Sequence, residues 1–364
     1  MDSKNKISNG QLKALMVTIV VGVGILSLPS DIAVIMDNDG WIGILLGGLI
    51  TIPFIIIIDR LFKLYPNKNF FQLGKEILNP IIFKIILVIF LFYIMLLLSI
   101  SVRIFADVIK AYLLETTPIE IIIITMLLSV SYMARSQIEV IARMAVIIYP
   151  IILGFIIFLL IINIPNMDLT NIYPVFQLNY KALLKGVLIG LFSYAGYEFI
   201  LLVLPMAENH KGTLKYCLNG IFIVIAIYLI VFFITLSQYG IHQLKREIWP
   251  TIAIVKEIDL PGYFLENLDG IIMAIWVMVI YGTLGPFLHF SGVVLSDILN
   301  TKEHQYLILP IIPIIYIISL YPKNLVQVEK ILVKIFNYIS IVSIMIIPTI
   351  LFVLGLVKKR RENQ

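Results

Sequence analysis

Two short segments combine residues that weaken a helix with groups that could bind a zwitterion. Residues 22–29, "GVGILSLP", place two glycines and a proline inside a long apolar stretch, and residues 191–199, "LFSYAGYEF", place small residues beside Glu198. If both segments lie at membrane depth, the backbone groups that they free must be satisfied by protein, water or ligand. The N–H groups after Gly24 would suit a carboxylate, and the carbonyls of the second segment would accept from an ammonium group.

The candidate ligand-binding residues come from these two segments and from two tyrosines in the middle of other apolar stretches. Small residues also serve close helix packing, and a tyrosine in mid-helix is also an ordinary packing residue, so this alternative stays open. The predicted set is Gly22, Val23, Gly24, Ile25, Leu26, Tyr93, Phe192, Ser193, Tyr194, Ala195, Gly196 and Tyr281.

Four ionisable residues inside apolar stretches are candidates for proton or ion coupling or gating. Glu198 is a functional hypothesis because an acidic group in a membrane is costly; it would couple protons, line a solvated cavity or gate, bind an ammonium group, or cap the break structurally. Arg103 either pairs with Asp107 one turn later or lines a cavity. Arg143 either extends to the membrane surface or takes the place of a coupling cation. His289 is either a polar contact between helices or a proton relay.

Several functional classes are excluded by what the sequence lacks. Cys217 is the single cysteine, so neither an intramolecular disulfide nor a cysteine-based metal site can form. No pair of residues has metal-ligand spacing, no nucleophile stands beside a base, and no phosphate-binding loop or nucleic-acid-binding patch is present. We therefore expect neither an enzyme nor a cofactor or metal.

The composition requires a lipid bilayer as the solvent. Hydrophobic residues make up 60% of the 364 residues, charged residues only 13%, and the mean hydropathy is +1.03. A single membrane domain over 1–364 without a removable signal peptide is expected. The candidate spans are 11–36, 41–64, 80–113, 118–134, 138–163, 183–206, 214–239, 268–297, 305–320 and 331–357.

The order of the spans predicts an internal repeat. The first and the sixth contain the glycine-rich breaks, and they are five spans apart, so the second half has the opposite topology. The long third and eighth spans and the short fourth and ninth match under the same offset. We therefore predict an all-α polytopic membrane protein with ten transmembrane helices, in a 5+5 inverted repeat of halves 11–163 and 183–357, with helices 1 and 6 discontinuous.

The distribution of basic residues predicts the orientation. Of the 27 Lys and Arg residues, 17 lie on the side that holds both termini and nine lie on the other, so both termini should be cytoplasmic. Residues 358–364 would form a cytoplasmic basic tail. The first external connection carries Asp31, Asp37 and Asp39 and no basic residue.

Two connections have features of their own. Residues 66–78 alternate apolar and charged groups as a short amphipathic helix on the inner surface would. Residues 240–267 form the longest external connection, in which Trp249 to Thr251 and the Pro261-Gly262 pair indicate turns and interfacial anchors. An ordered cap over the outer face is favoured over a direct ligand contact.

The two segments resemble those of the amino acid–polyamine–organocation transporter superfamily. A G-x-G-I/V-x-x-x-P signature of its first helix is matched through Gly22, Gly24 and Pro29, and an aromatic-x-G-x-E run of its sixth helix is matched through Gly196 and Glu198.

Within that superfamily the chain resembles the B subunit of spore germinant receptors, the spore permease family. The resemblance covers nearly the whole chain and includes "LLETTPIE" at 113–120, "IWPTIAIVKEIDLPGYF" at 248–264 and "KKRR" at 358–361. Members of the family often have Glu-Arg before the eighth span, whereas Glu266 is followed here by Asn267.

This resemblance implies a subunit in the inner membrane of a dormant spore that recognises a nutrient, typically an amino acid, and works with A and C subunits. Its expected output is signalling or ion release rather than uptake. A pocket bordered by Ile25, Leu26 and aromatic residues suits a small apolar amino acid, although packing alone would give the same residues. A proton-coupled amino acid permease is the alternative, and a scaffold without a ligand site is a third hypothesis.

Overall fold

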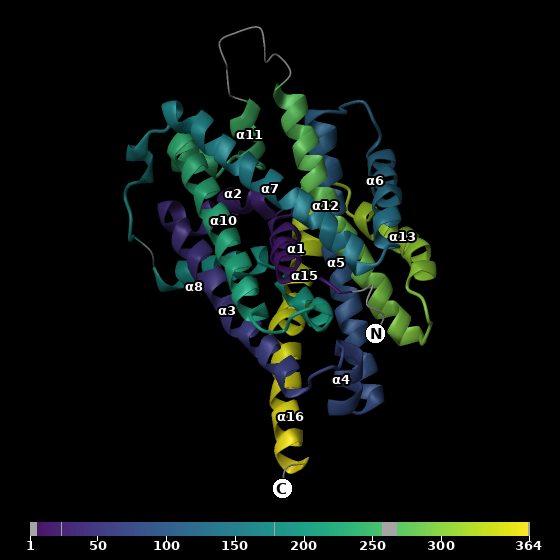
Figure 1. Cartoon of the computed structure of the whole chain (residues 1–364). Coiled ribbons are helices and arrows are strands. Elements are labelled where there is room, and N and C mark those ends of the chain that lie inside the picture. Colours follow the sequence, from purple (N-terminus) through teal and green to yellow (C-terminus); the bar gives the residue numbers. More distant parts are fainter. Residues whose placement is uncertain (1–5, 23, 178, 257–267, 363–364) are drawn as a thin grey trace.

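A computed structural model describes residues 6–22, 24–177, 179–256 and 268–362, and helices dominate all four segments (Figure 1). The only β pairing among these residues is an isolated bridge between Ile7 and Ala207. The helices are α1 Asn9–Val21, α2 Gly24–Met36, α3 Gly40–Leu64, α4 Phe70–Ile77, α5 Pro80–Tyr112, α6 Ile119–Ala134, α7 Ile138–Asn163, α8 Tyr180–Ser193, α9 Ile200–Val203, α10 Thr213–Leu244, α11 Pro250–Lys256, α12 Leu268–Leu299, α13 Gln305–Leu320, α14 Leu325–Gln327, α15 Lys334–Ser340 and α16 Ile347–Glu362.

The predicted apolar segments are helical, and both predicted breaks are present. The first break separates α1 from α2, and the second separates α8 from a bent continuation over Tyr197–Met206, at 45°. Among the described residues, six helical stretches are long and apolar enough to cross a membrane, and the bent pair makes a seventh. Of the shorter apolar helices, α1, α6 and α13 take the remaining predicted spans. The number of ten crossings and the repeat symmetry stay predictions.

The helix lengths follow the pattern on which the repeat was based. The third and eighth spans are α5 and α12, of 33 and 32 residues, and the fourth and ninth are α6 and α13, of 16 residues each. The tenth span is less regular than its sequence indicates, because π-helical turns at Val328–Val333 and Ile341–Ile346 interrupt it. Turns of this kind recur at functional sites.

Helix α1 lies at the centre of the bundle, packed against α7, α10 and α12 (Figure 1). Nine of its 13 residues are buried, as expected for a helix that is apolar on all sides. Close contact between α3 and α8 depends on small residues, since a Cβ at Gly43 would lie 3.0 Å from the carbonyl oxygen of Gly186. Small residues therefore permit close packing between α3 and α8, the helix that ends at the second break.

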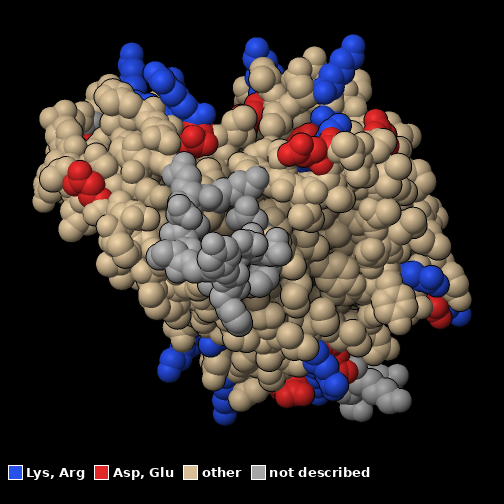
Figure 2. Space-filling model, turned by 90° about the horizontal axis from the view of Figure 1, so that it is seen from above, with Lys and Arg blue, Asp and Glu red and all other residues tan. Residues whose placement is uncertain are grey.

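Contacts divide the molecule into two ends that agree with the predicted sides. At the end of α4 and α16, Lys75 pairs with Asp297 at 2.7 Å, and the Lys358 ammonium donates to the carbonyl oxygen of Glu76 at 2.7 Å. At the opposite end, where α11 lies, Lys245 pairs with Asp37 (Figure 1). Seen from that end, charged side chains form small groups of both signs near the periphery of a mostly uncharged surface (Figure 2).

Both connections with features of their own contain a helix. Helix α4 is the expected amphipathic helix, begun by Asn69 as its N-cap, and it buries Phe70 and Leu73. In the long connection 240–267, the described part contains α11, whereas the Pro261-Gly262 pair and Glu266-Asn267 lie outside the described residues. Residues 358–362 of the predicted basic tail continue α16.

Candidate functional site

The first break is built around glycine. Helix α1 ends at Gly22, whose backbone has φ 14° and ψ −136°, and α2 begins at Gly24. A Cβ at Gly22 would lie 2.8 Å from the Thr283 methyl carbon, so α12 approaches too closely for a side chain. Val23, which belongs to the predicted ligand set, lies outside the described residues.

Side chains from two other helices satisfy the carbonyls that this break frees. The Thr283 hydroxyl of α12 donates to the carbonyl oxygen of Thr18 at 2.8 Å. The Tyr228 hydroxyl of α10 donates to the carbonyl oxygen of Val20 at 2.8 Å and to that of Ser193 at 3.1 Å. Because Val20 precedes the first break and Ser193 precedes the second, one hydroxyl joins the two half-helix ends.

At the second break, the side-chain carboxyl group of Glu198 accepts a hydrogen bond from the backbone two residues earlier. Gly196 has φ 113°, a left-handed conformation that favours glycine. Its N–H donates to Glu198 Oε2 at 2.8 Å, and the Tyr93 hydroxyl donates to Glu198 Oε1 at 2.8 Å. Glu198 is fully buried, so these two donors compensate for much of the loss of water around its carboxyl group. The geometry is that of a structural cap, one of the alternatives for this residue.

The external connection reaches the first break directly. Pro29 has no N–H and therefore cannot donate to the carbonyl oxygen of Ile25 one turn earlier. The Thr251 hydroxyl, from α11, donates to that oxygen at 2.7 Å. Trp249 beside it is buried. The described part of the connection, through α11, thus holds the outer half of the broken helix, and the prediction of a cap over the outer face stays a prediction.

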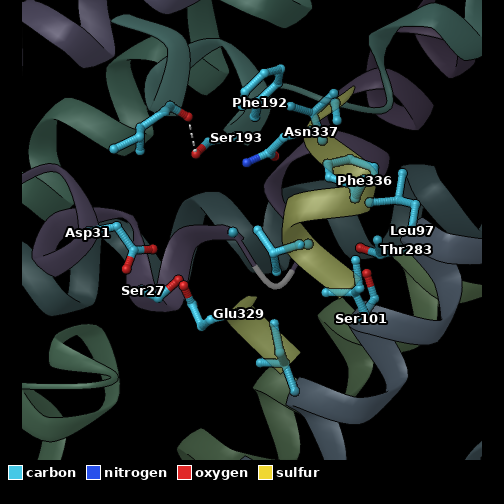
Figure 3. A pocket seen from close by; sticks show the side chains of 18 of the residues that line it. Ser27, Asp31, Leu97, Ser101, Phe192, Ser193, Thr283, Glu329, Phe336 and Asn337 are labelled. Atoms are coloured by element: carbon cyan, nitrogen blue, oxygen red, sulfur yellow. Dashed lines mark hydrogen bonds between the residues drawn. The ribbon is translucent and has the colours of Figure 1, made fainter. Parts of the chain in front are cut away.

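A cavity of about 520 Å³ lies where the two breaks meet (Figure 3). It is bordered by α1, α2, α5, α8, α12 and the π-helical turn and α15 of the last helix. Of the predicted ligand set, Gly22, Gly24, Phe192, Ser193 and Ala195 line it. Ile25, Leu26, Tyr194 and Gly196 are adjacent in the chain but do not line it.

The two tyrosines predicted to close the pocket lie elsewhere. Tyr93 is fully buried between the rings of Phe90 and Phe336, with its hydroxyl on Glu198. The Tyr281 hydroxyl faces the carbonyl oxygen of Ser129 in α6 at 3.4 Å. Neither tyrosine lines the cavity, because the Tyr93 side chain points toward Glu198 and the Tyr281 side chain points toward α6.

The other ionisable candidates also lie outside the cavity. Arg103 pairs with Asp107 at 2.9 Å and donates to the carbonyl oxygen of Ser319 at 3.0 Å, near the end of α13. Arg143 is exposed and pairs with Glu139 at 2.6 Å.

His289 is buried between helices as well. Its Nδ1 lies 3.0 Å from the carbonyl oxygen of Ala134 at the end of α6, and its ring meets that of His304 edge to face. Arg103, Arg143 and His289 therefore match the structural alternatives that the sequence left open.

Polar residues that were not in the predicted set line the cavity. Asp31 was placed in the first external connection, but it lies within α2 because the helix continues to Met36. The last helix contributes Glu329 and Asn337, and α5 contributes Ser101 (Figure 3). Lys334, also of the last helix, lines the cavity as well. The charge of Asp31 in an apolar stretch could have identified it from the sequence. The residues of the last helix could not be identified in this way, because the face that they present depends on the π-helical turns.

A second cavity, of about 660 Å³, lies at the end of α4 and α16, and neither break lines it. Its mixed lining includes the ionisable residues Lys6, Asp59, Glu208 and His210. Among the described residues, no group of three or more His, Cys, Asp and Glu side chains could hold a metal ion.

Comparison with known proteins gives one consistent result. A family described as "Spore germination protein" matches residues 6–328. The chain is 24% identical over 360 residues to spore germination protein YndE of Bacillus subtilis (strain 168), with 99% of each chain covered. It is 26% identical over 360 residues to spore germination protein A2 of the same organism, covering 98% of this chain and 97% of that protein.

Solved transporter structures have the same fold. A Na⁺-coupled sialic acid symporter superposes with a TM-score of 0.67 at 11% identity, over 97% of this chain and 79% of that chain. A nucleobase-cation-symport-1 family transporter gives 0.67 at 14% identity, over 99% and 82%. At these identities the likeness establishes the fold alone, and that fold is the one predicted from the paired breaks.

Proposed function

The chain belongs to the spore germination protein family, and from this premise we propose that it is the nutrient-sensing subunit of a spore germinant receptor. A small nutrient, an amino acid, binds in the cavity between the two breaks, and the conformational change passes to A- and C-type partner subunits. In this proposal the chain is a receptor subunit rather than an enzyme, in the spore inner membrane with both termini cytoplasmic.

The cavity at the junction of the two breaks is the observation that carries the proposal. Its volume falls within the range of roughly 300–1,000 Å³ that is typical of small-molecule sites. Gly24 lines it at the first turn of α2, where backbone N–H groups have no partner within the helix and attract a carboxylate. This volume and these N–H groups support the proposal of a zwitterion site.

The same arrangement supports a signalling output. The cavity touches both halves of the first broken helix, the end of α8 and the last helix, so a ligand bound there contacts elements that can move relative to one another. A ligand shifts such an equilibrium only by its difference in affinity between the two arrangements. α11, which holds α2 through Thr251, is the element best placed to report that shift at the outer face.

Deletion of the gene tests the proposal in spores. Germination in response to one class of nutrient should be lost, while uptake in growing cells stays normal; unchanged nutrient germination would refute it. Gly24→Leu should reproduce the loss, because Gly24 lines the cavity and a Cβ there would lie 3.4 Å from the Tyr228 hydroxyl and 3.6 Å from the Ser193 carbonyl oxygen. The matched control is Gly154→Leu, because a Cβ at Gly154 has no neighbour within 4 Å.

A proton-coupled amino acid permease is the second candidate, and the buried carboxyl group of Glu198 beside the break favours it. The purified chain in proteoliposomes should then accumulate labelled amino acid under an inward proton gradient. Accumulation that disappears with Glu198→Gln would support the permease, whereas binding without accumulation supports the receptor.

A further inference from the structure

We propose that the ligand of this cavity is a basic amino acid, whose side-chain cation is bound by Asp31 and Glu329. The inference deepens the proposed function, on which it rests, by assigning a ligand class to the same cavity. It uses four observations: an acidic wall, the lack of a cation beside that wall, a matching length, and a buried hydroxyl that faces the cavity.

The acidic wall is formed by two elements that are far apart in the sequence. Asp31 lies two turns into α2, and Glu329 lies in the π-helical turn Val328–Val333. Their carboxyl groups are within electrostatic range of each other, and Figure 3 shows both side chains directed toward Ser27. Two carboxylates that face one another repel unless a proton or a cation lies between them.

Neither carboxylate has a basic partner among the residues that the structure describes. The ion pairs there involve other carboxylates, and Lys334, the one basic residue that lines the cavity, is within 4.0 Å of neither Asp31 nor Glu329. With both carboxyl groups ionised, two carboxylates and one ammonium group give the cavity a formal charge of −1. A ligand with one net positive charge complements it, as a basic amino acid does at neutral pH.

The distance along α2 fits an extended basic side chain. Gly24 and Asp31 are seven residues apart, which corresponds to about 10 Å of helix. A basic amino acid spans roughly 7 Å from its carboxylate to its terminal nitrogen, and a hydrogen bond of about 3 Å at each end extends its reach to about 13 Å, which covers this distance. The α-carboxylate can thus meet the N–H groups at the start of α2 while the cation meets the acidic wall.

The side of the cavity formed by α5 suits the rest of such a ligand. Leu97, Ile100 and Ile104 present apolar surface for the methylene groups. Between them Ser101 is 1% exposed, lines the cavity and forms no hydrogen bond through its hydroxyl with any described residue (Figure 3). A buried hydroxyl without a partner is rare unless a ligand or water supplies one, so this group indicates a polar ligand independently of the acidic wall.

Matched ligands test the inference on the purified full-length chain in nanodiscs, by isothermal titration calorimetry. L-Citrulline has nearly the shape of L-arginine but a neutral urea group in place of the guanidinium. We expect L-arginine to bind at least about tenfold more tightly than L-citrulline, the effect of one charge-assisted contact. Asp31→Asn and Glu329→Gln should each remove that advantage and leave L-citrulline unchanged.

Controls separate the possible results. Glu120→Gln removes an exposed carboxylate outside the cavity and should have no effect. Glu329 is exposed at the cavity mouth, so its variant tests the inference even if Asp31→Asn fails to fold. Equal affinities for L-arginine and L-citrulline in the wild type would overturn the inference but not the proposed function.

Two further results would also overturn it. If a neutral amino acid binds only with Na⁺ or K⁺, and Glu329→Gln abolishes this dependence, the acidic wall holds an inorganic cation instead. If none of the twenty amino acids binds to folded protein, the proposed function falls together with the inference.

Discussion

Removal of one hydroxyl group should destabilise the structure at both helix breaks. The Tyr228 hydroxyl donates to the carbonyl oxygens of Val20 and Ser193, and Tyr228→Phe deletes that donor while it keeps the ring. Tyr228 is 1% exposed, so water cannot replace the lost group without entering the bundle. The ring contact with Tyr194, at 5.2 Å between centroids, is retained.

The expected cost follows from the number of acceptors that lose their donor. A buried polar group left without a partner destabilises a protein by about 1–3 kcal/mol, and hydrogen bonds between membrane helices contribute about 0.6 kcal/mol on average. One hydroxyl proton shared between two carbonyls cannot be worth two full hydrogen bonds. We therefore expect Tyr228→Phe to lower the free energy of unfolding by about 1–2 kcal/mol.

Unfolding by SDS in mixed micelles measures this difference. Tyr216→Phe is the matched control, since Tyr216 lies on the same helix, is 37% exposed and has no side-chain hydrogen bond with the described residues. Its effect should stay within about 0.5 kcal/mol. Equal effects of the two substitutions would refute the view that the shared hydroxyl stabilises the breaks.

Three further substitutions test single contacts by the same unfolding measurement. Gly196→Ala should lower the free energy of unfolding by about 1–2 kcal/mol because of the positive φ of Gly196, whereas Gly154→Ala should be neutral or stabilising. If both substitutions destabilise the protein equally, the positive φ of Gly196 is not the cause. Thr251→Val should lower the free energy of unfolding by about 1 kcal/mol in the wild type. In a Pro29→Ala background, where the restored N–H can donate to the Ile25 carbonyl oxygen, the same substitution should have little effect. Additive effects of the two substitutions would exclude the view that Thr251 compensates for the missing N–H. Glu198→Gln should keep ligand binding and should destabilise the protein less than Glu198→Ala does, because the amide oxygen still accepts from the Gly196 N–H. Loss of ligand binding in Glu198→Gln would favour a titrating role for Glu198.

The breaks were predictable because they follow from local chemistry. Glycine and proline weaken the interior of a helix through their own backbone chemistry, and two such segments five spans apart left few alternatives to a transporter-like fold. The start of α4 at Asn69 is local in the same sense, since the N-cap and its partner Gln72 are three residues apart. Helix lengths also follow from sequence, as runs of apolar residues bounded by charge or proline.

The groups that complete the breaks were not predictable, because their partners are remote in sequence. Tyr228 has the sequence context of an ordinary membrane tyrosine, and only the packing of α10 brings it to two carbonyls. Tyr93 was assigned to the ligand but is directed at Glu198, since the rotation of α5 about its axis cannot be read from its nearly uniform apolar sequence. Glu329 depends on a π-helical turn, which has no sequence pattern of its own.

The distribution of paired and unpaired polar groups around the breaks indicates that the cavity is a ligand site rather than a packing defect. On the protein side, Thr283, Tyr228, Glu198 and Thr251 supply partners to the freed backbone groups, so the broken helices do not require a ligand to be stable. On the cavity side, the Ser101 hydroxyl has no partner among the described residues, and an apolar defect would not retain such a group. At the breaks, the freed backbone groups are therefore closed by protein partners while the Ser101 hydroxyl stays open toward the cavity, which is the arrangement that a reversible receptor site requires.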